Sequence, residues 1–288
     1  MPQIDLNITD LYGKRWNLSH AVREVVANAE DVRRAGGTMR VEHCARTSTL
    51  TVTSEGQHLT DDALIFGETV KSGDSRLIGT FGDGLKVALA VFVRLGAAVK
   101  INTGRAIWTP AKIDRGRRGV IGVNTRALPA SQHRERVIVE VGSVTAADWA
   151  EWVKMFLFLT PPKNAVETSA GTLLRDAELR GSIFCRGVLV QRETERIYGY
   201  DIPTLTLNRD REIADTYEVE SAAREIWAEA SASAAMRPAL YDLLASPGCS
   251  MDVGYSAVGG EAGADIVAMF RANHGADAVP VLSSSEAT

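Results

Sequence analysis

Cysteine is scarce in the sequence, and no apolar run is long enough to cross a membrane. The three cysteines are Cys44, Cys185 and Cys249. Because they lie far apart, their spacing gives neither a metal-binding motif nor a disulfide framework. The longest apolar stretch, Leu85–Leu95, is interrupted by Lys86 and Arg94, and the N-terminal residues lack the apolar segment of a signal peptide. We therefore expect a cytoplasmic protein with no membrane association.

The sequence also lacks a strong charge of either sign. Its 32 basic and 36 acidic residues leave a net charge of -4, which excludes a globally basic surface for nucleic acid. A local basic loop at Arg115–Gly119 is the best place to look for a contact with nucleic-acid phosphates, and a simply solvated loop is the alternative. The client, protein or nucleic acid, therefore stays open.

The composition is that of a folded globular protein. Hydrophobic residues make up 45% and charged residues 24%, with 25 glycines and 9 prolines, which excludes collagen-like and disordered chains. The length of 288 residues allows two domains, and the clearest break is at Thr160–Pro162. We expect domains at 1–160 and 161–245, followed by a tail at 246–288. The abrupt end of that tail is compatible with a fragment of a longer protein.

The first predicted domain alternates helices and strands. A helix is predicted from Asn17 to Gly36, a strand at Arg46–Thr53, and an apolar helix that follows a glycine-rich turn and ends at Gly96. Further strands are predicted at Ala98–Thr103, Ile107–Lys112 and Arg136–Val141. This order favours an α/β fold of the α+β two-layer sandwich type over a doubly wound parallel sheet.

The second predicted domain is smaller, and its pattern is again mixed. A strand-like run at Gly181–Arg192 precedes a loop at Arg209–Asp215, which enters an amphipathic helix at Glu218–Ser231. In the tail, the pattern predicts a helix at Gly260–His274 and a short strand at Ala278–Leu282.

Three polar residues of the first predicted helix share one face. Glu24, Asn28 and Asp31 stand at positions i, i+4 and i+7. An asparagine amide oxygen can ligate magnesium while a carboxylate one turn away orients a water molecule, as hydrolysis of a phosphoanhydride requires. A solvated helix face has the same spacing, so the interpretation as a site needs a second motif.

The second motif is the segment GTFGDGLK at residues 79–86. Its glycines, Gly79, Gly82 and Gly84, let the backbone approach a ligand closely, and the helix that follows offers backbone N–H groups to a phosphate. The glycine spacing excludes a dinucleotide-binding fingerprint, and the valine after Lys86 excludes a Walker loop.

Together, the E-x-x-x-N-x-x-D helix and the I-G-x-F-G-x-G-L-K segment resemble the ATP-binding domain of the GHKL superfamily, which includes gyrase B, heat-shock chaperones, histidine kinases and MutL. The resemblance covers about the first 160 residues and implies a Bergerat-type fold with ATP and magnesium as ligands. It implies that Glu24 is the general base, that Asn28 is the magnesium ligand and that Asp31 belongs to the nucleotide site.

The same resemblance assigns the glycine-rich segment to the nucleotide. It implies contacts from Gly79, Phe81, Gly82, Gly84 and Lys86, and it places Lys71 where the mobile lid of these proteins joins the site.

A segment of the second domain looks like the start of the heat-shock chaperone middle domain, a transducer-like α/β domain. The matching residues are Gly181–Val190 and Leu205–Glu212. The resemblance implies that Arg211 reaches the γ-phosphate as an arginine finger, with Arg209 as the neighbour that can substitute. A surface ion-pair cluster is the alternative.

The sequence departs from the family at the adenine site. The family has an aspartate in a D-x-G-x-G turn, whereas the turn here begins with Ser54 and continues through Gly56. We expect the Ser54 hydroxyl to accept the adenine amino group, directly or through water, more weakly than a carboxylate does. The Gly-Thr pair of the family is also missing, and Glu135-Arg136 stands in its place.

These observations predict a magnesium-dependent ATPase that uses nucleotide-driven lid closure as a conformational switch. The alternative is a nucleotide-sensing binding or scaffold module that does not hydrolyse ATP, and phosphotransfer to a protein has little support. The resemblance further implies a nucleotide-dependent homodimer.

Overall fold

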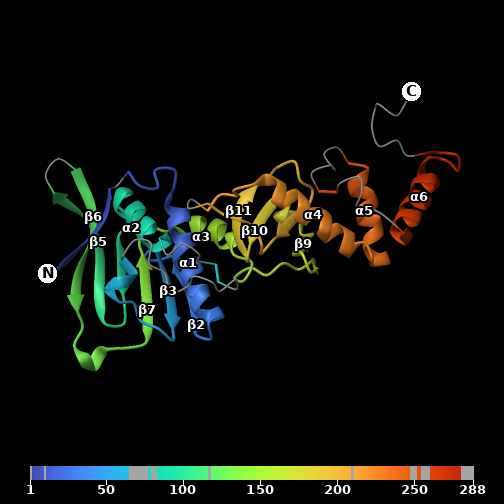
Figure 1. Ribbon diagram of the computed structural model, residues 1–288. Helices are drawn as coiled ribbons and strands as arrows, with labels where there is room; N and C mark the ends of the chain where they lie inside the picture. Colours follow the sequence, from blue (N-terminus) through green and yellow to red (C-terminus); the bar gives the residue numbers. More distant parts are fainter. Residues whose placement is uncertain are drawn as a thin grey trace. The chain divides into compact units, whose positions relative to one another are not determined.

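The computed structural model describes residues 2–9, 11–64, 77–78, 83–115, 118–208, 211–246, 252–253 and 260–279. The chain divides into two compact units, Met1–Leu159 and Thr160–Thr288, and the division lies at the Thr160–Pro162 segment. Each unit contains one β-sheet with helices packed on it, so the chain has an α+β fold (Figure 1). Residues from 246 onward fall within the second unit.

The first unit is built on a seven-stranded sheet of order β1-β6-β5-β4-β7-β3-β2, in which all pairings are antiparallel. The strands are β1 (Gln3–Thr9), β2 (Thr38–Cys44), β3 (Thr49–Glu55), β4 (Val99–Asn102), β5 (Ala106–Arg115), β6 (Arg118–Ala127) and β7 (Arg136–Val141). Along β3, Leu50, Val52 and Ser54 are buried, whereas the residues between them are partly exposed. This alternation shows that one face of the sheet forms the core.

Two helices cover that face. They are α1 (Leu18–Arg34) and α2 (Gly84–Arg94), which pack against each other (Figure 1). The helix α1 also packs on β2 and β3, and α2 packs on β5 and β6. A third helix, α3 (Ala146–Trp152), follows β7.

The start of α1 is fixed by a capping box. The Asn17 Oδ1 atom accepts the backbone N–H of His20 at 3.1 Å, and the His20 Nδ1 atom accepts that of Asn17 at 3.1 Å. These two bonds satisfy N–H groups that the first helical turn leaves unpaired. The helix ends before Gly36, whose φ of 100° suits glycine. The predicted helix is thereby confirmed.

The second unit has a five-stranded sheet of order β11-β10-β12-β9-β8, in which β10 and β12 are parallel and the other pairs antiparallel. Its strands are β8 (Ala165–Glu167), β9 (Thr172–Leu174), β10 (Ser182–Cys185), β11 (Val188–Arg192) and β12 (Gly199–Asp201). Its helices are α4 (Thr216–Ala230), α5 (Arg237–Leu244) and α6 (Gly260–His274). Short 3₁₀ turns occur in both units. Those of the first unit lie at Asp61–Leu64, Ala130–Gln132 and Val153–Met155, and those of the second unit lie at Ala177–Leu179 and Ala234–Met236.

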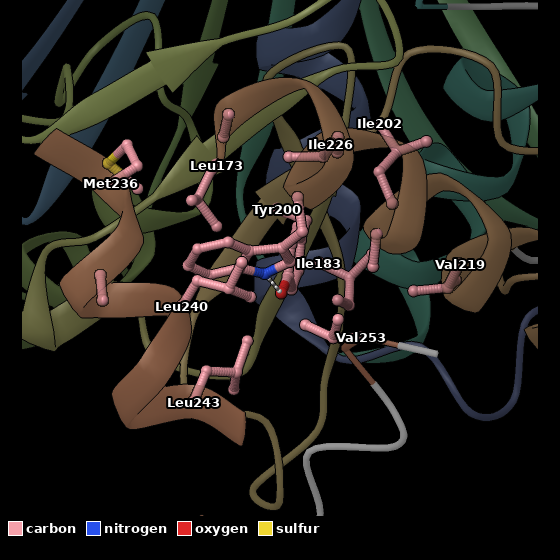
Figure 2. Close-up of a cluster of buried hydrophobic side chains, with 14 of the residues drawn as sticks. Leu173, Ile183, Tyr200, Ile202, Val219, Ile226, Met236, Leu240, Leu243 and Val253 are labelled. Carbon is pink, nitrogen blue, oxygen red and sulfur yellow. Dashed lines mark hydrogen bonds between the residues drawn. The ribbon is translucent and has the colours of Figure 1, made fainter. Parts of the chain in front are cut away.

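The core of this unit surrounds a hydrogen bond between two aromatic side chains. The Trp227 Nε1 atom of α4 donates to the Tyr200 hydroxyl of β12 at 2.9 Å, and both residues are fully buried. Figure 2 shows this bond among apolar side chains such as Leu240 of α5. Burial raises the pKa of Tyr200 well above its usual value, so the phenol stays neutral and can accept the indole N–H.

Three predicted elements differ from those observed. Arg46 lies in the turn between β2 and β3. The predicted strand Arg46–Thr53 therefore begins later than predicted, at Thr49, and is the second arm of a hairpin. The run Gly181–Arg192 is also a hairpin, because Arg186 and Gly187 turn the chain with φ values of 53° and 77°. The predicted loop Arg115–Gly119 joins strands β5 and β6, which pair up to Arg115 and Arg118.

Ala278 and Val279 lie in no strand, and the rest of the predicted strand Ala278–Leu282 lies outside the described residues. Across the described part of the chain, no helix has both the length and the hydrophobicity that a membrane span needs.

Candidate functional site

The polar stripe of α1 faces inward. Glu24 and Asp31 are 1% and 2% exposed, and Asn28, which lies between them, is partly exposed. A solvated helix face would expose both carboxylates. Because a buried charge is costly unless it is paired or hydrogen-bonded, the partners of each carboxylate define the site.

The Glu24 carboxylate lies between an arginine and the start of α2. Its Oε1 atom is 3.4 Å from Arg23 Nε, and the Arg23 guanidinium lies 5.6 Å from the ring centroid of Trp16. On the other side, a β-carbon added to Gly84 would collide with Glu24 Oε2. The absence of a side chain at Gly84 therefore lets a carboxylate approach the positive end of α2, where negative charge is stabilised.

The first turn of α2 carries a buried ion pair. Lys86 is fully buried, and its Nζ atom lies 3.4 Å from Oδ1 of Asp83, the N-cap residue of α2. The predicted phosphate-binding lysine is therefore at the N-terminus of α2, on the helix end that Glu24 approaches.

Asp31 joins α1 to a distant part of the chain. Its Oδ1 atom accepts the backbone N–H of Ile78 at 2.6 Å, and Leu77 and Ile78 are both buried. The bond links the polar stripe to the residue that precedes Gly79 in the sequence.

Ser54, the predicted adenine contact, is buried on the face of the first unit's sheet that forms the core. It lies on β3 opposite Val137 of β7 and is 5% exposed. Gly56, at the start of the next turn, has a φ of 110°, and its backbone N–H donates to the Glu135 carbonyl at 2.9 Å. The position predicted to contact adenine therefore holds one hydroxyl with an apolar neighbour across the strands.

Glu135 and Arg136 offer no substitute for the missing Gly-Thr pair. Glu135 is exposed and accepts hydrogen bonds from His58 and Arg105, which lower its pKa, the His58 bond most strongly. Arg136 stands opposite the exposed Glu55. Gly171 and Thr172, a Gly-Thr pair later in the sequence, lie in the second unit.

Several predicted site residues lie outside the described residues. They are Lys71, Gly79, Phe81 and Gly82, together with Arg209, the neighbour of Arg211. Their roles stay predictions.

Arg211 belongs to a tight loop of the second unit. An isolated bridge pairs Leu207 with Ile213, and the Arg211 backbone N–H donates to the Asn208 carbonyl at 3.0 Å. Asn208 and Glu212 exchange further hydrogen bonds through Oδ1 and Nδ2 of Asn208. Arg211 has a φ of 62°, which is unfavourable for a residue other than glycine, so these bonds hold a strained turn.

Sequence reasoning missed three residues at the Glu24 end of the site. Arg23 pairs with the carboxylate, Trp16 stacks on Arg23, and His20 lies half-buried one turn before Glu24. Burial, and then the charge of Arg23, lower the pKa of His20. Its spacing of four residues from Glu24 was the available signal, since residues at i and i+4 share a helix face.

A known protein and a solved structure are similar to parts of this chain. No protein-family model matches the chain. An uncharacterized protein of Mycoplasma pneumoniae is 25% identical over 227 residues, which cover 73% of this chain and 90% of that protein. The ATPase and transducer domains of DNA topoisomerase II from Balamuthia mandrillaris are similar at 15% identity and a TM-score of 0.31. That match covers 44% of this chain and 37% of the topoisomerase chain, and so low a TM-score assigns neither fold nor function.

Proposed function

We propose that the first unit is a magnesium-dependent ATP-binding and hydrolysing site. One observation carries the proposal: the Glu24 carboxylate is buried against Gly84 at the N-terminus of α2. Two motifs 60 residues apart in sequence thereby meet, one with a candidate base and one with the helix end that suits phosphate. Neither motif is specific alone, and their contact in the fold is what a hydrolytic site needs.

In this proposal Glu24 takes a proton from the water that attacks the terminal phosphate. Arg23 lies beside the carboxylate and compensates its charge on one side. Lys86 and the first N–H groups of α2 bind phosphate oxygens. Ser54 reads the base, and Lys71, Gly79, Phe81 and Gly82 contribute as the sequence predicts.

The residues present fit a magnesium ion held mainly by the nucleotide. Within the described ranges, no group of three or more histidine, cysteine, aspartate or glutamate side chains could hold a metal ion. Magnesium bound with phosphates needs only one or two protein ligands. Asn28 is the partly exposed member of the stripe, so it is the residue that would hold the ion, which neutralises phosphate charge when bound.

The test compares Glu24→Ala and Glu24→Gln with the wild-type full chain. We expect both variants to bind ATP within about threefold of wild type and to release phosphate about 100-fold to 10,000-fold more slowly, the range of general-base catalysis. Glu42→Ala is the matched control, since Glu42 is an exposed carboxylate of the same unit. Phosphate release by the Glu24 variants at the wild-type rate would exclude Glu24 as the base.

The second candidate function is nucleotide sensing without hydrolysis. It is favoured by the base-reading position, where a buried serine faces Val137 instead of a second polar group. ATP binding with no phosphate release by wild type would favour this candidate. In either case we propose a cytoplasmic protein that forms a homodimer when nucleotide binds. Light scattering with a non-hydrolysable ATP analogue tests the dimer, and an unchanged monomer mass would exclude it.

A further inference from the structure

Two acidic side chains, adjacent in sequence, are used differently at the end of α1. Glu30 is fully buried, and its carboxylate pairs with Arg33 and Arg34 of the same helix. Asp31 directs its Oδ1 atom to the backbone of Ile78, 47 residues away in sequence. The charge of Glu30 is therefore matched within α1, whereas the Oδ1 hydrogen bond of Asp31 serves a different segment.

The negative charge of Asp31 does not stabilise α1. It lies in the last turn of the helix, where the helix dipole disfavours negative charge. Burial adds a desolvation cost, which a charge-assisted hydrogen bond offsets. The bond to Ile78 is short, at 2.6 Å, and it is shielded from water because both residues are at most 5% exposed. Such a bond is stronger than the same bond at the surface.

The hydrogen bond to Asp31 fixes the backbone at Ile78. Leu77 and Ile78 pack into the core, and the sequence continues from Ile78 directly into Gly79. Five residues after Gly79 the chain reaches Gly84, which lies against Glu24. Ile78 is therefore bonded to α1 through Asp31, and Gly84 lies against Glu24 of the same helix.

We infer that Asp31 is a positioning residue of the nucleotide site proposed above, on which this role rests, and is not a ligand of nucleotide or metal. Its carboxylate fixes Ile78, the residue that precedes the glycine-rich segment, relative to Glu24. The required property is a hydrogen-bond acceptor at Oδ1. A ligand of magnesium or of a magnesium-bound water would require the negative charge instead.

Asparagine separates these two requirements, because Asp31→Asn keeps the acceptor and removes the charge. Asp31→Ala removes both. Asp148→Ala is the matched control: Asp148 also accepts a backbone N–H, that of Thr145, in the same unit. The first measurement is hydrogen exchange at the Ile78 amide in the full-length chain without nucleotide. We expect Asp31→Ala to exchange at least about tenfold faster than wild type, and Asp31→Asn and Asp148→Ala to exchange at the wild-type rate.

The second measurement is steady-state ATP hydrolysis with magnesium. We expect Asp31→Ala to raise KM and lower kcat, and Asp31→Asn to restore both to within about threefold of wild type. Loss of hydrolysis in Asp31→Asn with the Ile78 amide still protected would overturn the inference, because the charge would then be what matters. Unchanged exchange in Asp31→Ala would also overturn it.

The two measurements separate this role from the proposed function. A wild-type chain that neither binds nor hydrolyses ATP would refute the proposed function, and the role at the nucleotide site with it. The exchange rates would still show whether Asp31 anchors Ile78. If Asp31→Ala fails to fold, the comparison of Asp31→Asn with wild type decides between acceptor and charge.

Discussion

Gly84 and Glu24 are in such close contact that the glycine cannot carry a side chain without moving the carboxylate. Glu24 is 1% exposed, so its displaced carboxylate would have little room. In Gly84→Ala we therefore expect phosphate release to fall at least about tenfold. The helix itself should lose no intrinsic stability, because alanine has a higher helix propensity than glycine. Phosphate release and urea unfolding measure the two effects.

The control for this variant is Gly142→Ala. A β-carbon there would have its nearest contacts at 3.4 Å, with Ala98, which is an ordinary packing distance. Equal phosphate release by Gly84→Ala and Gly142→Ala would show that the position of Glu24 is unimportant.

Asn28→Ala tests the proposed role of Asn28 as a metal ligand. If the Asn28 amide oxygen coordinates magnesium, its loss should weaken ATP binding in the presence of magnesium by about tenfold or more, and should have little effect when magnesium is chelated. Calorimetric titration with and without magnesium measures both affinities. Asn124→Ala is the control, since Asn124 is an asparagine on β6 bonded to Gln3. Equal losses with and without magnesium would contradict the assignment.

Ser54 tests recognition of the base. A serine hydroxyl beside Val137 should discriminate poorly between ATP and GTP, and Ser54→Asp should shift the preference towards ATP by about tenfold, because a carboxylate is the stronger acceptor for the adenine amino group. Competition binding with the two nucleotides measures the ratio. A strong ATP preference in wild type that survives in Ser54→Ala would show that another residue reads the base.

The local pattern predicted the helices of this fold better than its hairpins. The helix at α1 has a polar cap at Asn17 and a periodic apolar face, and both signals are local. The hairpin β2–β3 depends on pairing with β7, and the turn at Arg46 carries no glycine or proline to mark it. The pairing of β5 with β6 likewise depends on tertiary contacts across a basic segment that resembles a loop.

The residues of the candidate site stand out in the sequence where side-chain type decides the chemistry. Glu24 and Asn28 stand out by spacing, and the contact of Glu24 with Gly84 supports their joint interpretation. The bond from Asp31 to Ile78 was not predictable, because its donor is a backbone N–H and any residue except proline provides one.

His20 predicts a pH dependence of stability. Its pKa in the folded chain is lowered from 6.5, chiefly by burial, so the unfolded chain binds more protons in the range just below pH 6.5. The contribution of His20 to the free energy of unfolding is therefore fully present above pH 6.5, and it is lost as the pH falls through the folded-state pKa. His20→Gln removes the titration and keeps an acceptor for the Asn17 N–H, as in a common capping box.

We expect the free energy of unfolding to fall less between pH 7.5 and about 5.5 in His20→Gln than in wild type. Urea unfolding at both pH values measures the difference. Parallel losses in the two proteins would show that other groups cause the pH dependence.

Arg211→Gly separates the function of an arginine from the strain that it carries. Glycine accepts the φ of 62° at this position, so the free energy of unfolding should stay unchanged or rise by up to about 1 kcal/mol. If the guanidinium stabilises charge on the transferred phosphate, phosphate release should nevertheless fall about 1,000-fold or more. Arg186→Gly is the control, because Arg186 has a similar φ of 53° in the same unit. A more stable Arg211→Gly chain with wild-type turnover would leave Arg211 as a residue of a surface turn.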